Sequence, residues 1–142
     1  MKLLVALETS EHDDVIVGPA NALAQAASAE VVLLNVMNPM TDAGHIVADN
    51  REAAVQQVLS ERRVYLEEFA RRFDPPASVR LEQLAHGEDV AGGIARVARE
   101  EQADVLVIAT NRASGVRGML LGSVAQHLLR VSPCPVLVVR VD

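Results

Sequence analysis

The chain has 142 residues, of which 50 % are hydrophobic and only 2 % aromatic, and its formal net charge is −6. A chain of this length buries roughly two-thirds of its unfolded surface, so it can form a core without disulfides or metals. The charge and the scarcity of rings argue against nucleic acid, whose phosphates need basic residues and whose unpaired bases stack on aromatic side chains. The single cysteine, Cys134, excludes an internal disulfide, and no apolar segment has the length of a membrane span. We therefore predict one cytoplasmic domain, residues 1–142, with neither a nucleic-acid nor a membrane partner.

The first 29 residues predict a strand followed by a helix. Residues 3–7 form an aliphatic run, as in strands that are buried on both faces. Residues 20–29 are rich in alanine and predict a helix whose first turn contains Pro19, where proline is tolerated. The intervening sequence His12-Asp13-Asp14 is interpreted as a solvated acidic turn rather than a metal site, because adjacent helical residues point in different directions.

A second strand and a long helix follow. Residues 31–36 are almost continuously aliphatic, and residues 51–73 carry apolar side chains at helical spacing. The three aromatic residues of the chain lie four residues apart in this helix: Tyr65, Phe69 and Phe73. Their common face predicts core packing or a dimer face rather than a ligand cage. Residues 38–50 have no regular pattern, and we expect a loop there that acts as a mobile lid.

The second half of the chain continues this alternation. Residues 79–85 alternate apolar and charged positions, which is typical of a strand near the edge of a sheet. Two further strands are predicted at residues 105–109 and 136–141, and two helices at residues 89–101 and 123–131. Gly92 and Gly93 each cost a helix about 1 kcal/mol relative to alanine, so we expect them to permit close packing.

Strands that alternate with helices predict right-handed crossovers and a parallel sheet covered on both faces. The predicted fold class is therefore α/β, with an open, five-stranded, mainly parallel sheet and helices on both sides. In such a sheet, ligands bind beyond the carboxyl ends of the strands, where the strand order reverses.

The most informative carboxyl end follows residues 105–109. The chain between Thr110 and Ser123 contains three glycines and runs into a helix, whose first N–H groups can bind an anion together with the Ser123 hydroxyl. Residues 105–141 contain arginine but no Asp or Glu, so this part of an acidic chain is positive. No Lys-Ser or Lys-Thr follows the glycines, which excludes a Walker A loop. A dinucleotide fingerprint would instead follow the first strand.

Several segments resemble the universal stress protein family. The similarity is most specific in residues 107–125 (VIATNRASGVRGMLLGSVA) and 128–139 (LLRVSPCPVLVV), and residues 4–11 (LVALETSE) resemble the family's first strand and turn. The resemblance covers essentially the whole chain. It implies a Rossmann-like fold similar to that of the adenine nucleotide alpha hydrolases, with the fifth strand outermost and a homodimer formed through residues 136–141.

The family contains members that bind ATP and members that do not. The ATP binders carry a glycine, two residues, a second glycine, nine residues and then Gly-Ser or Gly-Thr. The matching positions here are Ala109, Arg112, Gly122 and Ser123, so the last pair is present and the first two glycines are replaced. Arg112 either fills the phosphate cradle or pairs with an anion through its guanidinium group.

The resemblance also implies contacts on the adenine side. An aspartate that follows the family's first strand appears here as Glu8, the next residue is Thr9 where the family has glycine, and Val36 matches a position that contacts adenine. The implied cofactor site therefore comprises eight residues: Glu8, Thr9, Val36, Ala109, Asn111, Arg112, Gly122 and Ser123.

Three functions remain open at this point. The first is a cytoplasmic stress-response regulator or sensor that binds ATP, another adenine nucleotide or another anion at the loop after the fourth strand. The second is a protein-interaction module that has lost the nucleotide and acts as a homodimer on an unknown protein partner. Slow ATP hydrolysis ranks last, because the loop offers no general base and no metal ligand is evident. We accordingly assign no catalytic and no metal-binding residue.

Overall fold

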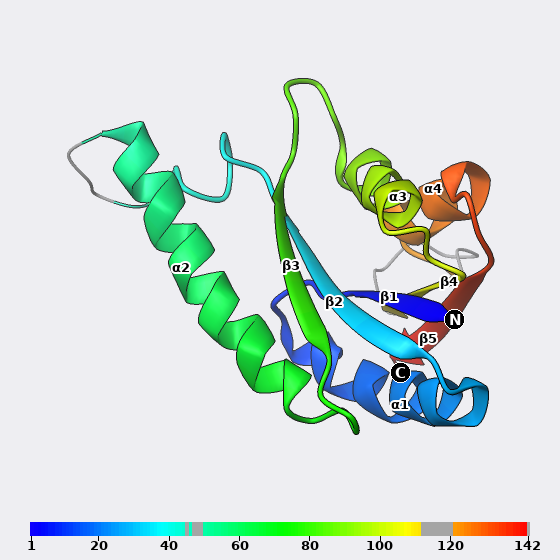
Figure 1. Cartoon of the computed structure of the whole chain (residues 1–142). Helices are drawn as coiled ribbons and strands as arrows, with labels where there is room; N and C mark the ends of the chain where they lie inside the picture. Colours follow the sequence, from blue (N-terminus) through cyan, green and yellow to red (C-terminus); the bar gives the residue numbers. More distant parts are fainter. Residues whose placement is uncertain (45, 47–49, 112–120, 142) are drawn as a thin grey trace.

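The structure, a computed structural model, describes residues 1–44, 46, 50–111 and 121–141, with the backbone alone for Asn111. It contains one five-stranded sheet (Figure 1) made of β1 (Lys2–Ala6), β2 (Glu30–Met37), β3 (Ser78–Gln83), β4 (Val105–Asn111) and β5 (Val136–Val141). The strand order is β3-β2-β1-β4-β5, and each neighbouring pair is parallel. The predicted α/β fold class is confirmed.

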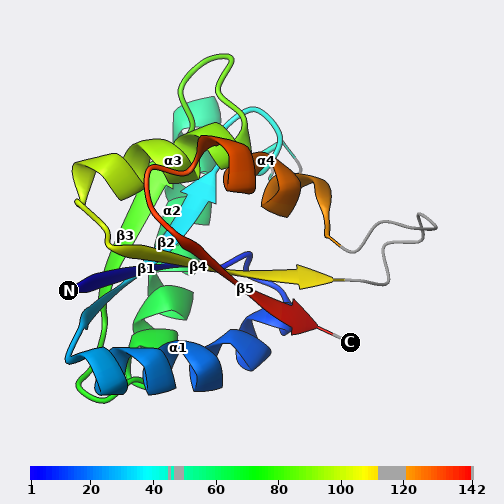
Figure 2. The same cartoon turned by 90° about the vertical axis from the view of Figure 1, so that its right-hand side faces the viewer.

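The helices form a layer on each side of the sheet. They are α1 (Asp14–Ala27), α2 (Arg51–Ala70), α3 (Val90–Glu100) and α4 (Ser123–Val131). Figure 2 shows α3 and α4 on one face and α1 on the other, where α2 also packs. Each of α2, α3 and α4 begins within one residue of its predicted start. None of the helices in the described part of the chain is long and apolar enough to cross a membrane.

Two apolar cores lie on the two faces of the sheet, because successive side chains of a strand point to opposite sides. The core under α1 and α2 includes Leu3, Val5, Leu33, Ile16 and Leu66. The core under α3 and α4 includes Leu4, Leu34, Leu106, Val97 and Leu128. The aromatic residues belong to the first core: Phe69 and Phe73 are buried, and Tyr65 packs against them. Core packing of this aromatic stripe is thereby confirmed.

The edge strands are β3 and β5. Along β3, Val79 and Leu81 pack into the core beneath α2, whereas Arg80 and Glu82 form ion pairs with residues of α3 on the opposite face. The alternation seen in the sequence therefore reflects a strand with one apolar face and one charged face, at the edge where it was expected.

The predicted start of the first helix is wrong. α1 begins at Asp14 and follows a 3₁₀ turn over Glu11–Asp13, so Pro19 lies inside the helix rather than in its first turn. A capping box starts the helical backbone, because the Ser10 side chain accepts the N–H of His12 and the Asp13 carboxylate accepts the N–H of Ser10. This local signal outweighs the single helical hydrogen bond that an exposed proline removes.

Gly93 allows α3 to approach the end of the sheet closely. A Cβ atom added there would collide with the Leu84 side chain and lie 3.7 Å from a methyl group of Val36. The expectation of close packing is therefore confirmed for Gly93. At Gly92, an added Cβ would meet the side chain of Asp89 at 2.9 Å.

Candidate functional site

A pocket of about 470 Å³ opens at the carboxyl ends of β1, β2 and β4. This is where the strand order reverses, since the chain extends the sheet from β1 through β2 to β3 and then returns to place β4 on the other side of β1. Its apolar wall is built from strands and from α3: Ala6, Leu34, Val36, Val90, Ile94 and Ile108.

The fold brings most of the predicted site residues to this one pocket. Five of them line it: Glu8, Val36, Ala109, Gly122 and Ser123. Asn111 is described only as backbone at the end of β4, and Arg112 lies outside the described residues, as do His45 and residues 47–49 of the predicted lid. Predicted residues from segments more than 100 positions apart in the chain therefore line the same pocket.

Thr9 follows Glu8 but is not among the residues that line the pocket. Its φ of 58° lies in the left-handed region, which β-branched residues rarely adopt. The backbone at this position therefore explains why glycine is suited to it.

The start of α4 presents backbone N–H groups to the pocket. The first helical hydrogen bond runs from the Gln126 N–H to the Gly122 carbonyl at 3.0 Å, so the N–H groups of Ser123, Val124 and Ala125 precede it. The Gly122 N–H donates to the buried Thr110 hydroxyl at 2.9 Å, which holds the end of β4 against the start of α4. The N-cap residue of α4, Gly122, has no side chain with which to cap the helix, and the positive end of the helix dipole suits an anion.

Asp13 holds the turn that carries Glu8. It was expected to be solvated, but it is only 1 % exposed. Its carboxylate accepts the N–H of Glu8 at 2.9 Å, the N–H of Ser10 at 3.2 Å and the hydroxyl of Tyr65 at 2.6 Å. The expectation was wrong because three donors compensate the burial of this charge. Burial and the hydrogen bond to Asp13 raise the pKa of Tyr65, so its hydroxyl stays a donor.

Arg62 is a pocket residue that the sequence analysis missed. Its Nη1 donates to Oδ1 of Asn35 at 2.9 Å and to the Val36 carbonyl at 3.4 Å, and lies 3.2 Å from the Asp42 carboxylate. The buried Asn35 side chain in turn donates to the Leu7 carbonyl at 2.7 Å. A continuous polar chain therefore crosses the pocket from the end of β1 to the segment after β2.

A signal for Arg62 was present in the helix pattern. The residue lies four positions from both Val58 and Leu66, on the stripe where α2 buries apolar side chains. A charged residue at such a position needs polar partners inside the fold. Asn35, the polar residue within the aliphatic run of β2, supplies one of them.

His12 also lines the pocket, and its Nδ1 lies 3.8 Å from the Glu8 carboxylate. Among the residues that the structure describes, no group of three or more His, Cys, Asp or Glu side chains is arranged to hold a metal ion. The described polar side chains of the pocket can therefore contact a ligand through hydrogen bonds and individual ion pairs.

Known proteins are similar to this chain in sequence and in architecture. A model of the universal stress protein family matches residues 1–140. The chain belongs to the universal stress protein family. A universal stress protein of Thermus aquaticus is 30 % identical over 139 residues, with 97 % of each chain covered. A solved structure from this family, from Burkholderia pseudomallei, is 28 % identical, covers 97 % of this chain and 94 % of its own, and gives a TM-score of 0.72.

One solved relative contains an adenine nucleotide. The universal stress protein from Archaeoglobus fulgidus in complex with dAMP covers 97 % of this chain and 96 % of its own, with 19 % identity and a TM-score of 0.60. At that identity the similarity shows the shared fold.

Proposed function

We propose that this universal stress protein is a cytoplasmic stress-response regulator or sensor that binds an adenine nucleotide in the pocket at the ends of β1, β2 and β4. The observation that carries the proposal is the joining of an apolar wall to a helix N-terminus, whose N-cap residue is glycine, within one pocket. Its volume of about 470 Å³ lies in the range of small-molecule sites. The complex of a relative with dAMP supports the choice of ligand.

The two ends of the pocket suit the two ends of a nucleotide. A base would lie against the aliphatic side chains of Val36 and Ile94, because Tyr65, Phe69 and Phe73 pack in the core and do not line the pocket. The phosphate would accept hydrogen bonds from the first N–H groups of α4 and from the Ser123 hydroxyl. Glu8 lies at the end of β1 between these two regions.

A matched pair of substitutions at Ser123 tests this placement. Calorimetric titration of AMP and ATP, each with and without Mg²⁺, should show binding to the unmodified protein. Ser123→Asp should weaken ATP binding about tenfold, because the new carboxylate would repel the phosphate. The variant should still fold, since the helix dipole stabilises a carboxylate at the start of a helix. Ser123→Asn should retain most of the affinity. The absence of binding by the unmodified protein, or equal affinities of the two variants, would refute the proposal.

Arg112→Gly distinguishes the two roles of that arginine. Tighter ATP binding by the variant would mean that the side chain fills the phosphate cradle, and weaker binding would mean that it pairs with the phosphate. Phosphate release in the same samples, lost in Ser123→Asp, would indicate slow hydrolysis at this site.

A second proposal concerns assembly: we propose that β5 pairs with β5 of a second copy to form a homodimer, through which the protein acts on a protein partner. β5 is an edge strand, and its apolar residues from Val136 to Val139 are only partly buried. An apolar strand edge favours pairing with another strand.

The backbone of β5 offers a selective test of the dimer. The Pro135 carbonyl accepts the Leu106 N–H on the β4 side, so the alternation along the strand directs the Val138 N–H away from β4. Val138→Pro removes that outward donor without removing a bond to β4, whereas Val138→Thr keeps it. Light scattering should give a monomer for the proline variant and a dimer for the threonine variant. A dimer in both would exclude this interface.

A further inference from the structure

Arg62 has hydrogen-bonding capacity that the fold does not use. All three of its contacts within the described part of the chain, to Asn35, Val36 and Asp42, are made by Nη1. Nε and Nη2 have no partner among the described residues. The side chain is 20 % exposed and lines the pocket. Among the described residues, the guanidinium group is therefore anchored by one nitrogen, and the N–H groups of its other two nitrogens can donate to a ligand.

The charge around Arg62 indicates what kind of group these donors would meet. The Asp42 carboxylate lies 3.2 Å from Nη1 and is itself held by the Asn38 N–H at 2.9 Å. The positive charge is thus already paired, which makes this end a poorer site for phosphate than the start of α4. A neutral group with hydrogen-bond acceptors suits two donors of a paired cation.

The adjoining residues narrow the choice to a base. Arg62 donates through Nη1 to the backbone of Val36, and both residues line the pocket, so the guanidinium group lies next to the apolar wall on which the proposed base would pack. Adenine presents ring nitrogens that are acceptors beside an amino group that is a donor. Arg62 and the Glu8 carboxylate present the complementary donor and acceptor within one pocket. Guanine places a carbonyl oxygen where adenine has its amino group.

From this geometry we infer that Arg62 is the base-reading residue of the pocket, donating from Nε or Nη2 to a ring nitrogen of adenine. The inference rests on the proposed function and adds a specificity-determining residue to it. Arg62 then discriminates adenine from an analogue that lacks the contacted ring nitrogen. Glu8 disfavours guanine, whose carbonyl oxygen would face its carboxylate, and the start of α4 binds the phosphate of either nucleotide.

Adenine analogues that lack one ring nitrogen test this inference atom by atom. The probes are AMP, GMP and the 1-deaza, 3-deaza and 7-deaza forms of AMP, titrated against the unmodified protein and Arg62→Met. The unmodified protein should bind AMP about tenfold more tightly than one of the three analogues, in which the arginine loses an acceptor. It should also bind AMP more tightly than GMP, whose carbonyl oxygen would face the Glu8 carboxylate. Arg62→Met should bind AMP about tenfold more weakly and no longer distinguish that analogue from AMP.

Two results would overturn the inference. One is AMP binding by the unmodified protein without discrimination among the analogues, and the other is discrimination that persists in Arg62→Met. The absence of AMP binding would instead refute the proposed function itself. Arg63→Met, a change at the exposed neighbouring arginine, is the control and should bind like the unmodified protein. If Arg62→Met does not fold, Arg62→Gln replaces it, since this shorter side chain keeps a hydrogen-bonding group beside Asn35 and Asp42, and the same loss of discrimination is expected.

Discussion

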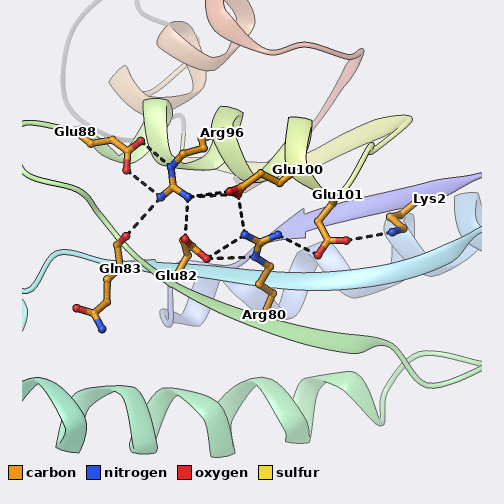
Figure 3. Close-up of polar contacts among 8 residues, drawn as sticks. All are labelled: Lys2, Arg80, Glu82, Gln83, Glu88, Arg96, Glu100 and Glu101. Atoms are coloured by element: carbon orange, nitrogen blue, oxygen red, sulfur yellow. Dashed lines mark hydrogen bonds and ion pairs between the residues drawn. The ribbon is translucent and has the colours of Figure 1, made fainter.

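Arginine serves different purposes in two regions of this molecule. Along the face of β3 that lies beneath α3, Arg96 uses all of its nitrogens (Figure 3): Nε and Nη2 contact Glu88, and Nη1 contacts Glu82 and Glu100. At the pocket, all contacts of Arg62 with described residues are made by Nη1. All three guanidinium nitrogens of Arg96 are therefore bonded within the fold. Arg62 is held through one nitrogen, and its other two have no partner among the described residues.

The charged region, defined here as the β3–α3 network, extends beyond Arg96. Its eight residues are Lys2, Arg80, Glu82, Gln83, Glu88, Arg96, Glu100 and Glu101. Arg80 contacts Glu82 within β3 and both Glu100 and Glu101 after it, and Lys2 contacts Glu101 at 3.1 Å. The network therefore joins β1, the edge strand β3 and the C-terminal half of α3.

The pKa values of the carboxylates show what this pairing does. Hydrogen bonds from Arg96 and from the Ala85 N–H lower the pKa of Glu88. For Glu82 and Glu101, burial alone would raise the pKa, but hydrogen bonds from the neighbouring cations outweigh it and the pKa is lowered. The β3–α3 network therefore stabilises the folded state, whereas the polar chain at Arg62 forms part of the pocket lining.

The largest loss of stability is expected within the pocket region, at Asp13. Asp13→Ala should lower the free energy of unfolding by about 3 kcal/mol, since it leaves three donors unpaired at roughly 1 kcal/mol each. Urea denaturation measures the change. Asp14→Ala, which removes an exposed ion pair with Arg72, is the control and should cost less than about 1 kcal/mol. Equal losses in the two variants would contradict the role assigned to Asp13.

Arg96→Met should separate the two regions. The free energy of unfolding should fall by about 2 kcal/mol, because the partly buried Glu88 loses its cationic partner and Glu82 and Glu100 keep only Arg80. AMP affinity, measured by calorimetry on the folded variant, should stay unchanged. A loss of affinity as large as that expected for Arg62→Met would mean that the network is part of the site.

Tyr65→Phe should have a smaller effect than either. The change removes one hydrogen bond to Asp13 and leaves the ring in the core, so a loss of about 1 kcal/mol is expected from urea denaturation. The Asp13 carboxylate keeps its two backbone donors in this variant. A loss matching that of Asp13→Ala would show that the tyrosine hydroxyl supplies the whole effect.

The response to acid should be the most gradual effect. The pKa values of Glu82, Glu88 and Glu101 are lowered from 4.5, so their contribution is fully present at neutral pH and is lost as the pH falls from about 4.5 through the lowered values. The free energy of unfolding, measured from pH 6 to pH 3, should therefore decline. Arg96→Met should show a shallower decline, and an equal slope would exclude Arg96 as the cause.

The sequence predicted the strands and three helix starts because hydrophobic periodicity is a local property. It also marked Glu8, Val36, Ala109, Gly122 and Ser123, which the fold then placed in one pocket. It misplaced the start of α1, where the capping residues Ser10 and Asp13 override the alanine-rich pattern. Asp13 and Arg62 were missed for one reason: each is a charged residue whose partners lie on another element.

From its sequence alone, this acidic, aromatic-poor chain is predicted to form an α/β sheet, to place β3 at an edge, and to end the glycine-rich segment at the start of a helix. These features depend on side-chain pattern and backbone preference within short segments. Whether an arginine is fully paired, as Arg96 is, or bonded through one nitrogen, as Arg62 is among the described residues, depends on acceptors that the fold brings from distant segments. It could therefore be seen in the tertiary structure and not in the sequence. Arg62 and Asn35 are 27 residues apart in the chain, and their contact exists because α2 packs across β2.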